Sequence, residues 1–260
     1  DRKPVTRLKG KNFFKVNILW FFIMVPTLFV VGRGGFALKP VGIIEASKYT
    51  EPENLAFVLP TAFTMIKTID QGSLEQVRYM SDKEALKLFN PIKRTHPQDI
   101  LPDNTNVVVI MLESFGTEFV GAYNNGNGYT PFLDSIINES LTFDYSFANG
   151  KRSIEAVPAV IASMPTMMEN AYISSPYGNN KINTLPNILK KHGYESAFFH
   201  GATNGSMSFD GFSRICGFDQ YYGRYEYNND DHFDKTWGIL DEYFNPWSAK
   251  QMSKMKEPFF

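Results

Sequence analysis

The chain has 260 residues, 43% of them hydrophobic, so it can bury a full core and is not a disordered protein. Its formal net charge is −1, which gives no overall positive field of the kind that binds nucleic acid. It has one cysteine, Cys216, which excludes an intrachain disulfide framework. The function must therefore be sought in local patterns.

Residues 1–33 have the pattern of a basic segment followed by a membrane-spanning helix. Six lysines and arginines lie within residues 1–15 against one acid, and residues 16–31 carry no charge. With its flanking aromatic residues this stretch approaches the roughly 17 to 20 residues that a bilayer requires. A cleaved signal peptide and a buried core helix are the alternatives, but residues 32–36 are a poor cleavage site. Because basic residues mark the cytoplasmic side, we expect the rest of the chain outside the cytoplasm.

Residues 34–103 are interpreted as a juxtamembrane arm and linker. Residues 55–59 and 62–66 are apolar enough to pack on another surface, and residues 82–88 have the composition of one or two helical turns. Three prolines between residues 90 and 106 are typical of a linker. A separate domain is therefore expected to begin at about residue 104.

Residues 104–260 alternate between strand and helix patterns, which predicts an α/β fold with a mostly parallel sheet and helices on both faces. The expected strands are 107–112, 141–147 and 195–200, and an apolar strand is expected to begin at the end of the chain. The expected helices are 130–139, 154–164, 184–193, 237–244 and 246–256, with a further amphipathic helix ending at Gly217.

Two residues stand where such a sheet places its chemistry. Glu113 follows six apolar residues, and the carboxyl ends of parallel strands are where open α/β sheets bind ligands. Such a carboxylate is costly to bury without a partner, so Glu113 is a candidate metal ligand, with an ordinary strand-end glutamate as the alternative. Ser153 ends a glycine-containing loop and begins a helix beside Lys151 and Arg152. It is a candidate nucleophile, compatible with a plain N-cap role.

The order and spacing of five segments resemble the lipoteichoic acid synthase-like phosphoglycerol transferases of the alkaline phosphatase/sulfatase superfamily. The segments are residues 107–114, 129–133, 149–165, 193–201 and 237–242. The resemblance covers about residues 104–260 and implies that they form the N-terminal part of a sulfatase-like catalytic domain. It also implies an anchor in a bacterial-type cytoplasmic membrane, a phospholipid donor, and a glycan or polyol-phosphate acceptor.

The same resemblance implies roles for individual residues. A divalent cation, usually manganese with zinc or magnesium as alternatives, would be held by Glu113, by the nucleophile Ser153 and by a later Asp-His pair. A bound cation lowers the pKa of a serine hydroxyl and neutralises phosphoryl oxygens. His200 matches the histidine of the headgroup pocket, with a core histidine as the alternative. Lys151 and Arg152 would stabilise the oxyanion, with a solvated basic pair as the alternative.

This sequence departs from the family pattern at two places. The acid, tryptophan and arginine that follow the family's histidine are replaced by residues 202–210, where Asn204 and Asp210 are the candidate substitutes. Asp231 and His232 lie in a polar run and are interpreted as a surface loop, so the later metal ligands are expected beyond Phe260 and this fragment should turn over little alone. Cys216 lacks the Cys-x-Pro-x-Arg motif of ordinary sulfatases and is interpreted as a core residue.

Three functions remain open from the sequence. The leading hypothesis is a membrane-anchored, metal-dependent transfer of phosphoglycerol or a related headgroup through Ser153. The second is hydrolysis of phosphate or sulfate esters on the same fold, since both reactions share one covalent intermediate. The third is a membrane-tethered binding module without catalytic activity. The sequence predicts no nucleic-acid partner.

Overall fold

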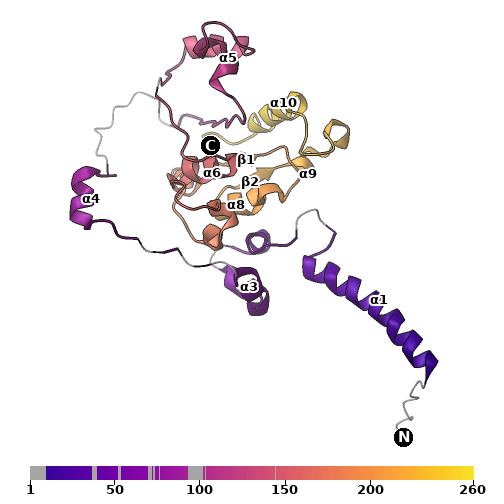
Figure 1. Ribbon diagram of the computed structural model, residues 1–260. Coiled ribbons are helices and arrows are strands. Elements are labelled where there is room, and N and C mark those ends of the chain that lie inside the picture. The colour runs from indigo at the N-terminus through magenta and orange to yellow at the C-terminus, as the bar shows by residue number, and fades with distance from the viewer. Residues whose placement is uncertain are drawn as a thin grey trace.

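The computed structural model describes residues 10–36, 40–51, 54–69, 72, 74–75, 77–92, 102, 104–143 and 145–260. Figure 1 shows a central body built around two strands, with a long N-terminal helix that projects away from it. The body contains β1, β2, α6, α8, α9 and α10, and the smaller helices α3, α4 and α5 lie at its margins.

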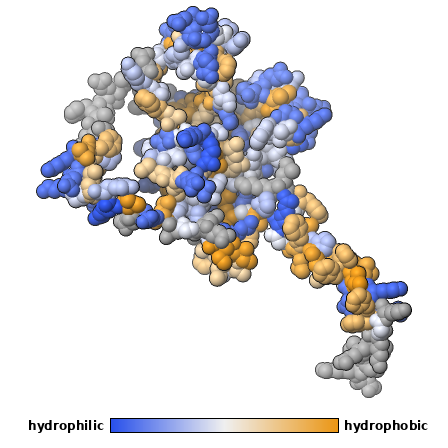
Figure 2. All heavy atoms as spheres, viewed as in Figure 1, coloured by the Kyte–Doolittle hydropathy of each residue, from blue (hydrophilic) through white to orange (hydrophobic). Residues whose placement is uncertain are grey.

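The predicted N-terminal helix is confirmed as α1, Lys11–Arg33. It ends because Gly34 adopts a left-handed conformation and, with Gly35, returns N–H groups to the last carbonyls. The helix is long and apolar enough to cross a membrane, and its apolar window is not buried in the protein (Figure 2). The part of the basic segment before Gly10 lies outside the described residues.

The arm after α1 is attached to the body by a short 3₁₀ helix, η1, Ile44–Lys48. Ile44 is part of the main core cluster, and the Ser47 hydroxyl donates to the carbonyl of Gly211 at 2.9 Å. Lys48 forms an ion pair with Asp210 at 2.6 Å. Next come α2, Leu55–Val58, and α3, Thr61–Thr68, and the expected helix at 82–88 is confirmed as α4, Asp82–Leu88.

The named strands are β1, Ala197–Phe199, and β2, Gln220–Tyr222, which pair in parallel with Phe198 opposite Tyr221. The chain end extends this pairing, because the Phe260 N–H donates to the Glu195 carbonyl and the Ala197 N–H donates to the Phe260 carbonyl. On its other side the same segment accepts an N–H from Val107 at the Phe259 carbonyl. The predicted parallel α/β architecture and the expected strand at 195–200 are therefore confirmed.

Two expected strands are absent from the described structure. Residues 107–112 form no strand, because Val107 alone is hydrogen-bonded to a neighbouring segment and the six side chains are 38% to 75% exposed. A parallel strand with this composition requires neighbours that cover it on both faces. Residues 141–143 and 145–147 also form no strand, and their large side chains are exposed.

The remaining helices lie near their expected positions with two differences: the short helix at 224–227 was not predicted, and the helices expected at 237–244 and 246–256 form one helix that continues through Pro246. Their bounds are α5 Pro131–Asn138, α6 Ser153–Ala162, α7 Leu185–Lys190, α8 Phe209–Ile215, α9 Arg224–Tyr227 and α10 Asp241–Met252. The 3₁₀ helices are η3 Thr117–Phe119, η4 Gly121–Tyr123, η5 Tyr172–Ser174, η6 Pro176–Asn179, η7 Ser206–Ser208 and η8 Asp230–His232. The expected helix at 237–244 starts late because an Asp234 carboxylate oxygen accepts three backbone N–H groups, from Thr236, Trp237 and Gly238, and holds a turn there.

Helices cover both faces of the strands. On one face, Phe198 of β1 contacts a buried cluster that includes Val157 of α6 and Phe212 of α8. On the other face, Tyr222 packs edge-on against Trp247 of α10 at 5.7 Å between ring centroids. Cys216 is fully buried in the first cluster, as expected, and burial raises the pKa of its thiol.

We predict that Phe212→Ala destabilises the protein strongly, because Phe212 is 1% exposed and packs edge-on against Tyr172. Truncation of a fully buried phenylalanine costs about 3 to 5 kcal/mol of unfolding free energy. The control is Phe132→Ala in α5, where the ring is 77% exposed and little change is expected. Urea unfolding of both variants measures the difference, and equal midpoints would show that Phe212 is not a core residue.

Candidate active site

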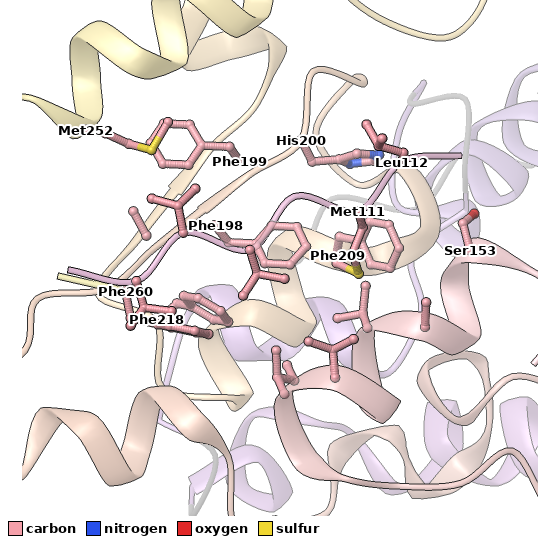
Figure 3. A pocket seen from close by; sticks show the side chains of 18 of the residues that line it. Met111, Leu112, Ser153, Phe198, Phe199, His200, Phe209, Phe218, Met252 and Phe260 are labelled. Atoms are coloured by element: carbon pink, nitrogen blue, oxygen red, sulfur yellow. The ribbon is translucent and has the colours of Figure 1, made fainter. Parts of the chain in front are cut away.

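One cavity of about 280 Å³ is lined by three of the candidate residues that the sequence singled out. Its walls are apolar and come from residues 107–112, α6, β1, α8 and the chain end, while Glu113, Ser153 and His200 supply polar groups. Figure 3 shows Ser153 and His200 at the same end of this cavity, with Phe260 and Phe218 at the opposite end. The three residues predicted to share one edge of the sheet therefore line one site.

Ser153 is the first residue of α6, and the helix cap is Arg152 rather than the serine. The serine hydroxyl is therefore not the helix cap. The preceding loop requires glycine at position 150, because a Cβ there would lie 2.5 Å from Oε2 and 2.6 Å from Cβ of Glu155. The loop therefore packs closely against α6, and this packing fixes the position of Ser153.

Glu155 holds the loop in place through hydrogen bonds. One of its carboxylate oxygens, Oε2, accepts the backbone N–H groups of Lys151 and Arg152 at 2.8 and 3.1 Å. The other, Oε1, accepts Nε and Nη2 of Arg152 at 3.0 and 2.6 Å. The hydrogen bonds from Arg152 lower the pKa of the Glu155 carboxyl against the opposing effect of burial. The Arg152 guanidinium is thus bound to a carboxylate, whereas Lys151 is exposed beside it.

Glu113 lies at the end of the apolar segment and is exposed to solvent as well as lining the cavity. The next residue, Ser114, has a φ of 58°, a left-handed conformation that is uncommon for residues other than glycine. Such a conformation turns the chain sharply directly after the carboxylate. Strained residues of this kind cluster at functional sites.

The donor set fits part of a divalent-cation site. Glu113 and Ser153 offer two oxygen atoms to one cavity, and oxygen ligands suit hard divalent cations. Among the residues that the structure describes, no group of three or more histidine, cysteine, aspartate or glutamate side chains is close enough to hold a metal. These two residues therefore do not form a full coordination shell by themselves.

His200 follows β1 and is held by aromatic neighbours. Its Nδ1 lies 3.3 Å from the hydroxyl of Tyr221, and its ring packs edge-on against Phe209 at 4.9 Å. Burial lowers the pKa of His200 to about 4, with the negative charge of Asp210 acting weakly in the other direction. The imidazole is therefore neutral at pH 7, so it offers hydrogen-bonding groups rather than a positive charge to the cavity.

Other sequence candidates are placed outside this cavity. Asn204 donates to the Glu226 carboxylate and accepts the Tyr225 N–H, so it ties η7 and α9 together. Asp210 is buried and paired with Lys48. The Asp231–His232 pair lies in η8 near the surface, with His232 stacked on Tyr243 at 3.8 Å between ring centroids. Asn204 and Asp210, named as substitutes for the family's headgroup contacts, are thus bound to other side chains, and from the same stretch Met207 and Phe209 line the cavity.

The family model for sulfatases matches residues 105–260. The chain belongs to the sulfatase family. The match begins within a residue of the domain start expected from the linker composition, and it confirms the resemblance drawn from the five segments.

Relatives and solved structures agree with this assignment. A lipoteichoic acid synthase from Staphylococcus saprophyticus is 26% identical over 223 residues, covering 82% of this chain and 33% of that protein. Phosphoglycerol transferase I from Escherichia coli is 26% identical over 163 residues, covering 56% of this chain and 20% of that protein. A crystal structure from Vibrio parahaemolyticus, of a protein in the alkaline phosphatase superfamily, superposes with a TM-score of 0.60 at 27% identity and covers 70% of this chain and 48% of that chain. The chain spans about a third of the length of the lipoteichoic acid synthase relatives.

Sequence reasoning missed Glu155 and Tyr221. The signal for Glu155 was present, because a glutamate three residues after a helix cap is the position from which a side chain reaches back to the N-terminal N–H groups. Tyr221 had no local signal, since its contact with His200 depends on the register between β1 and β2.

We predict that His200 makes the protein less stable as the pH falls from about 6.5 to about 4. An unfolded histidine titrates near 6.5, so in this window the unfolded chain binds a proton that the folded chain does not. The loss amounts to on the order of 2 kcal/mol of unfolding free energy. His200→Gln should remove this part of the pH dependence, as measured by urea unfolding across the window.

The matched control is His192→Gln, because His192 is exposed at the end of α7. This variant should retain the pH dependence of the unchanged protein. If His200→Gln retains it as well, His200 is not held neutral in the folded state.

Proposed function

We propose that this protein transfers a phosphoglycerol or related headgroup from a phospholipid donor to a glycan or polyol-phosphate acceptor, with Ser153 as the nucleophile. The single observation that carries the proposal is that Glu113, Ser153 and His200 line one otherwise apolar cavity. The sulfatase family and the names of the relatives support the reaction class. We further propose that α1 anchors the protein in a membrane, with the catalytic domain outside the cytoplasm.

The residues of this site would act in two steps. In the first, Ser153 Oγ forms a bond to the donor phosphorus and loses its proton, while the bond from phosphorus to the lipid alcohol breaks and that alcohol takes up a proton. In the second, an acceptor hydroxyl displaces Ser153 from phosphorus and the serine regains its proton. The N-terminal end of α6 favours the negative charge of the phosphoryl group.

Each neighbouring residue has a distinct role in this proposal. Glu155 holds the loop so that Ser153 points into the site, and Lys151 offers the exposed cation beside it. Neutral His200 would form a hydrogen bond with the headgroup. Glu113 and Ser153 would contribute two ligands to a divalent cation, most often manganese in this family, and such a cation when bound neutralises phosphoryl oxygens.

We predict that Ser153→Ala abolishes headgroup transfer from a radiolabelled phosphatidylglycerol donor by the full-length, membrane-inserted protein. Removal of a covalent nucleophile costs at least about a thousandfold in rate. The control is Ser135→Ala, since Ser135 lies in α5 and is exposed. Transfer at the unchanged rate in Ser153→Ala would contradict the proposed mechanism.

Transfer and hydrolysis are separated by the products of the same assay. If a headgroup acceptor is present, transfer yields a labelled acceptor, whereas hydrolysis yields the free phosphorylated headgroup at the same rate with or without acceptor. The assay uses a phospholipid as the phosphodiester donor. The apolar walls of the cavity adjoin its polar groups, and such a cavity suits a substrate with a lipid part.

We predict that Mn²⁺ raises the thermal midpoint of the full-length protein and that Glu113→Gln removes most of the rise. A ligand at about a hundredfold excess over its Kd stabilises the folded state by about 2.7 kcal/mol. The matched control is Glu118→Gln, an exposed glutamate in η3 that does not line the cavity. A midpoint insensitive to Mn²⁺, Zn²⁺ and Mg²⁺ would favour a binding module without catalytic activity.

A further inference from the structure

The arm after α1 carries an apolar surface that the body of the protein leaves uncovered. In α3, Ala62, Met65, Ile66 and Ile69 follow one another at the spacing that places side chains on one face of a helix. Met65, Ile66 and Ile69 are 65%, 73% and 80% exposed, and no residue of α3 is buried. Figure 2 shows this surface as a hydrophobic patch at the margin of the body. We call these four residues, together with Phe57 of α2, the arm patch.

The arm patch follows α1 by a few tens of residues, and a backbone hydrogen bond holds the start of the arm to the end of α1. The Val41 N–H donates to the carbonyl of Arg33, the last residue of α1, at 2.9 Å. Helix η1 begins three residues later, and α2 contacts η1 through the buried Leu55. Figure 1 shows α3 at the margin of the body from which α1 projects. The apolar surface of α1 and the arm patch therefore lie on neighbouring parts of the molecule.

We propose that the arm patch lies in the interface of the same lipid bilayer that α1 spans, as a second and shallower membrane contact. The inference rests on the proposed role of α1 as a membrane anchor. An exposed apolar stripe on a short helix is removed from water when it enters the boundary between headgroups and acyl chains. Lys67, whose ammonium lies 5.7 Å from the centre of the Phe63 ring, adds a positive charge on α3 that would attract anionic headgroups.

The contact would orient the cavity relative to the membrane. Leu55 packs the arm onto η1, and η1 is joined to α8 by the Lys48–Asp210 ion pair and the hydrogen bond from Ser47 to Gly211. At the same end of α8, Phe209 lines the cavity, and its ring packs edge-on against His200. A lipid interface on the arm patch would therefore fix the height and tilt of the cavity above the donor lipids.

The test places an environment-sensitive fluorophore on single cysteines in the membrane-inserted protein. The positions are Met65→Cys in the arm patch, Phe22→Cys at the middle of α1 and Leu86→Cys on α4, where the side chain is also exposed. Native Cys216 is fully buried and is left unchanged. The vesicles contain phosphatidylcholine and phosphatidylglycerol, with a nitroxide quencher at a shallow or a deep acyl position.

A fluorophore at residue 65 should be quenched several-fold more by the shallow nitroxide than by the deep one, because interfacial helices lie about 5 to 10 Å into the headgroup boundary. Residue 22 should show the reverse order, and residue 86 should be quenched by neither. If residue 65 behaves like residue 86 while residue 22 is quenched by the deep nitroxide, the inference is overturned and the anchor stands. If residue 22 is not quenched, the anchor itself fails.

A second variant separates a membrane contact from a protein contact. Ile69→Asp, combined with the label at residue 65, should lower the shallow quenching several-fold without changing the thermal midpoint, because residue 69 is exposed. Leu88→Asp on α4 should leave the quenching unchanged. Crosslinking between residue-65 cysteines of two copies, with no quenching by lipid, would assign the patch to a dimer and overturn the proposal.

Discussion

The geometry of the site depends on one buried carboxylate. Glu155 is 6% exposed and gathers four N–H groups from two consecutive residues, two from the backbone and two from the Arg152 guanidinium. A buried carboxylate without such donors would be strongly unfavourable, so the loop must close on it. Closure is possible only because Gly150 has no side chain to collide with Glu155. The position of Ser153 at the start of α6 follows from this arrangement.

This arrangement also gives the two cationic residues of the loop, Lys151 and Arg152, different roles. Arg152 neutralises Glu155, and its planar guanidinium suits the paired geometry better than a lysine would. Lys151 keeps its charge outside this pair, beside the helix start. Lys151 thus leaves one exposed cation beside the start of α6, while the neutral His200 adds a polar group to the cavity without further positive charge.

The sequence predicted the elements whose signals are local. Thr184 caps α7 by accepting the Asn187 N–H, Gly217 follows α8 in a left-handed conformation, and the apolar stretch at 16–31 lies within α1. It failed at residues 107–112 and 141–147, where strand formation depends on partners distant in the chain rather than on composition. It also failed at Trp237, where the hydrogen bonds to Asp234 override a helical pattern.

In the candidate site, too, the sequence predicted the residues with local signals and missed the contacts that depend on distant segments. Glu113, Ser153 and His200 were found because each follows or precedes a recognisable element, and the structure brings them to one cavity. Asn204 was named from its place after the histidine, yet its amide is occupied by Glu226 and Tyr225, which adjoin it only after β1 and β2 pair. Position along the chain therefore identified groups at the ends of elements, but not groups whose partners are set by the folding of a loop.

The link from the arm to the active site explains why a surface segment contributes to the core. Ile44 enters the same buried cluster as Val157 of α6, and Lys48 pairs with Asp210 of α8. A passive tether would gain nothing from ordering these residues, since fixing a backbone costs about 1 to 2 kcal/mol per residue. The burial of Ile44 and the pairing of Lys48 offset that cost and hold η1 against α8. The proposed membrane contacts of the arm would act on the cavity through this packed segment.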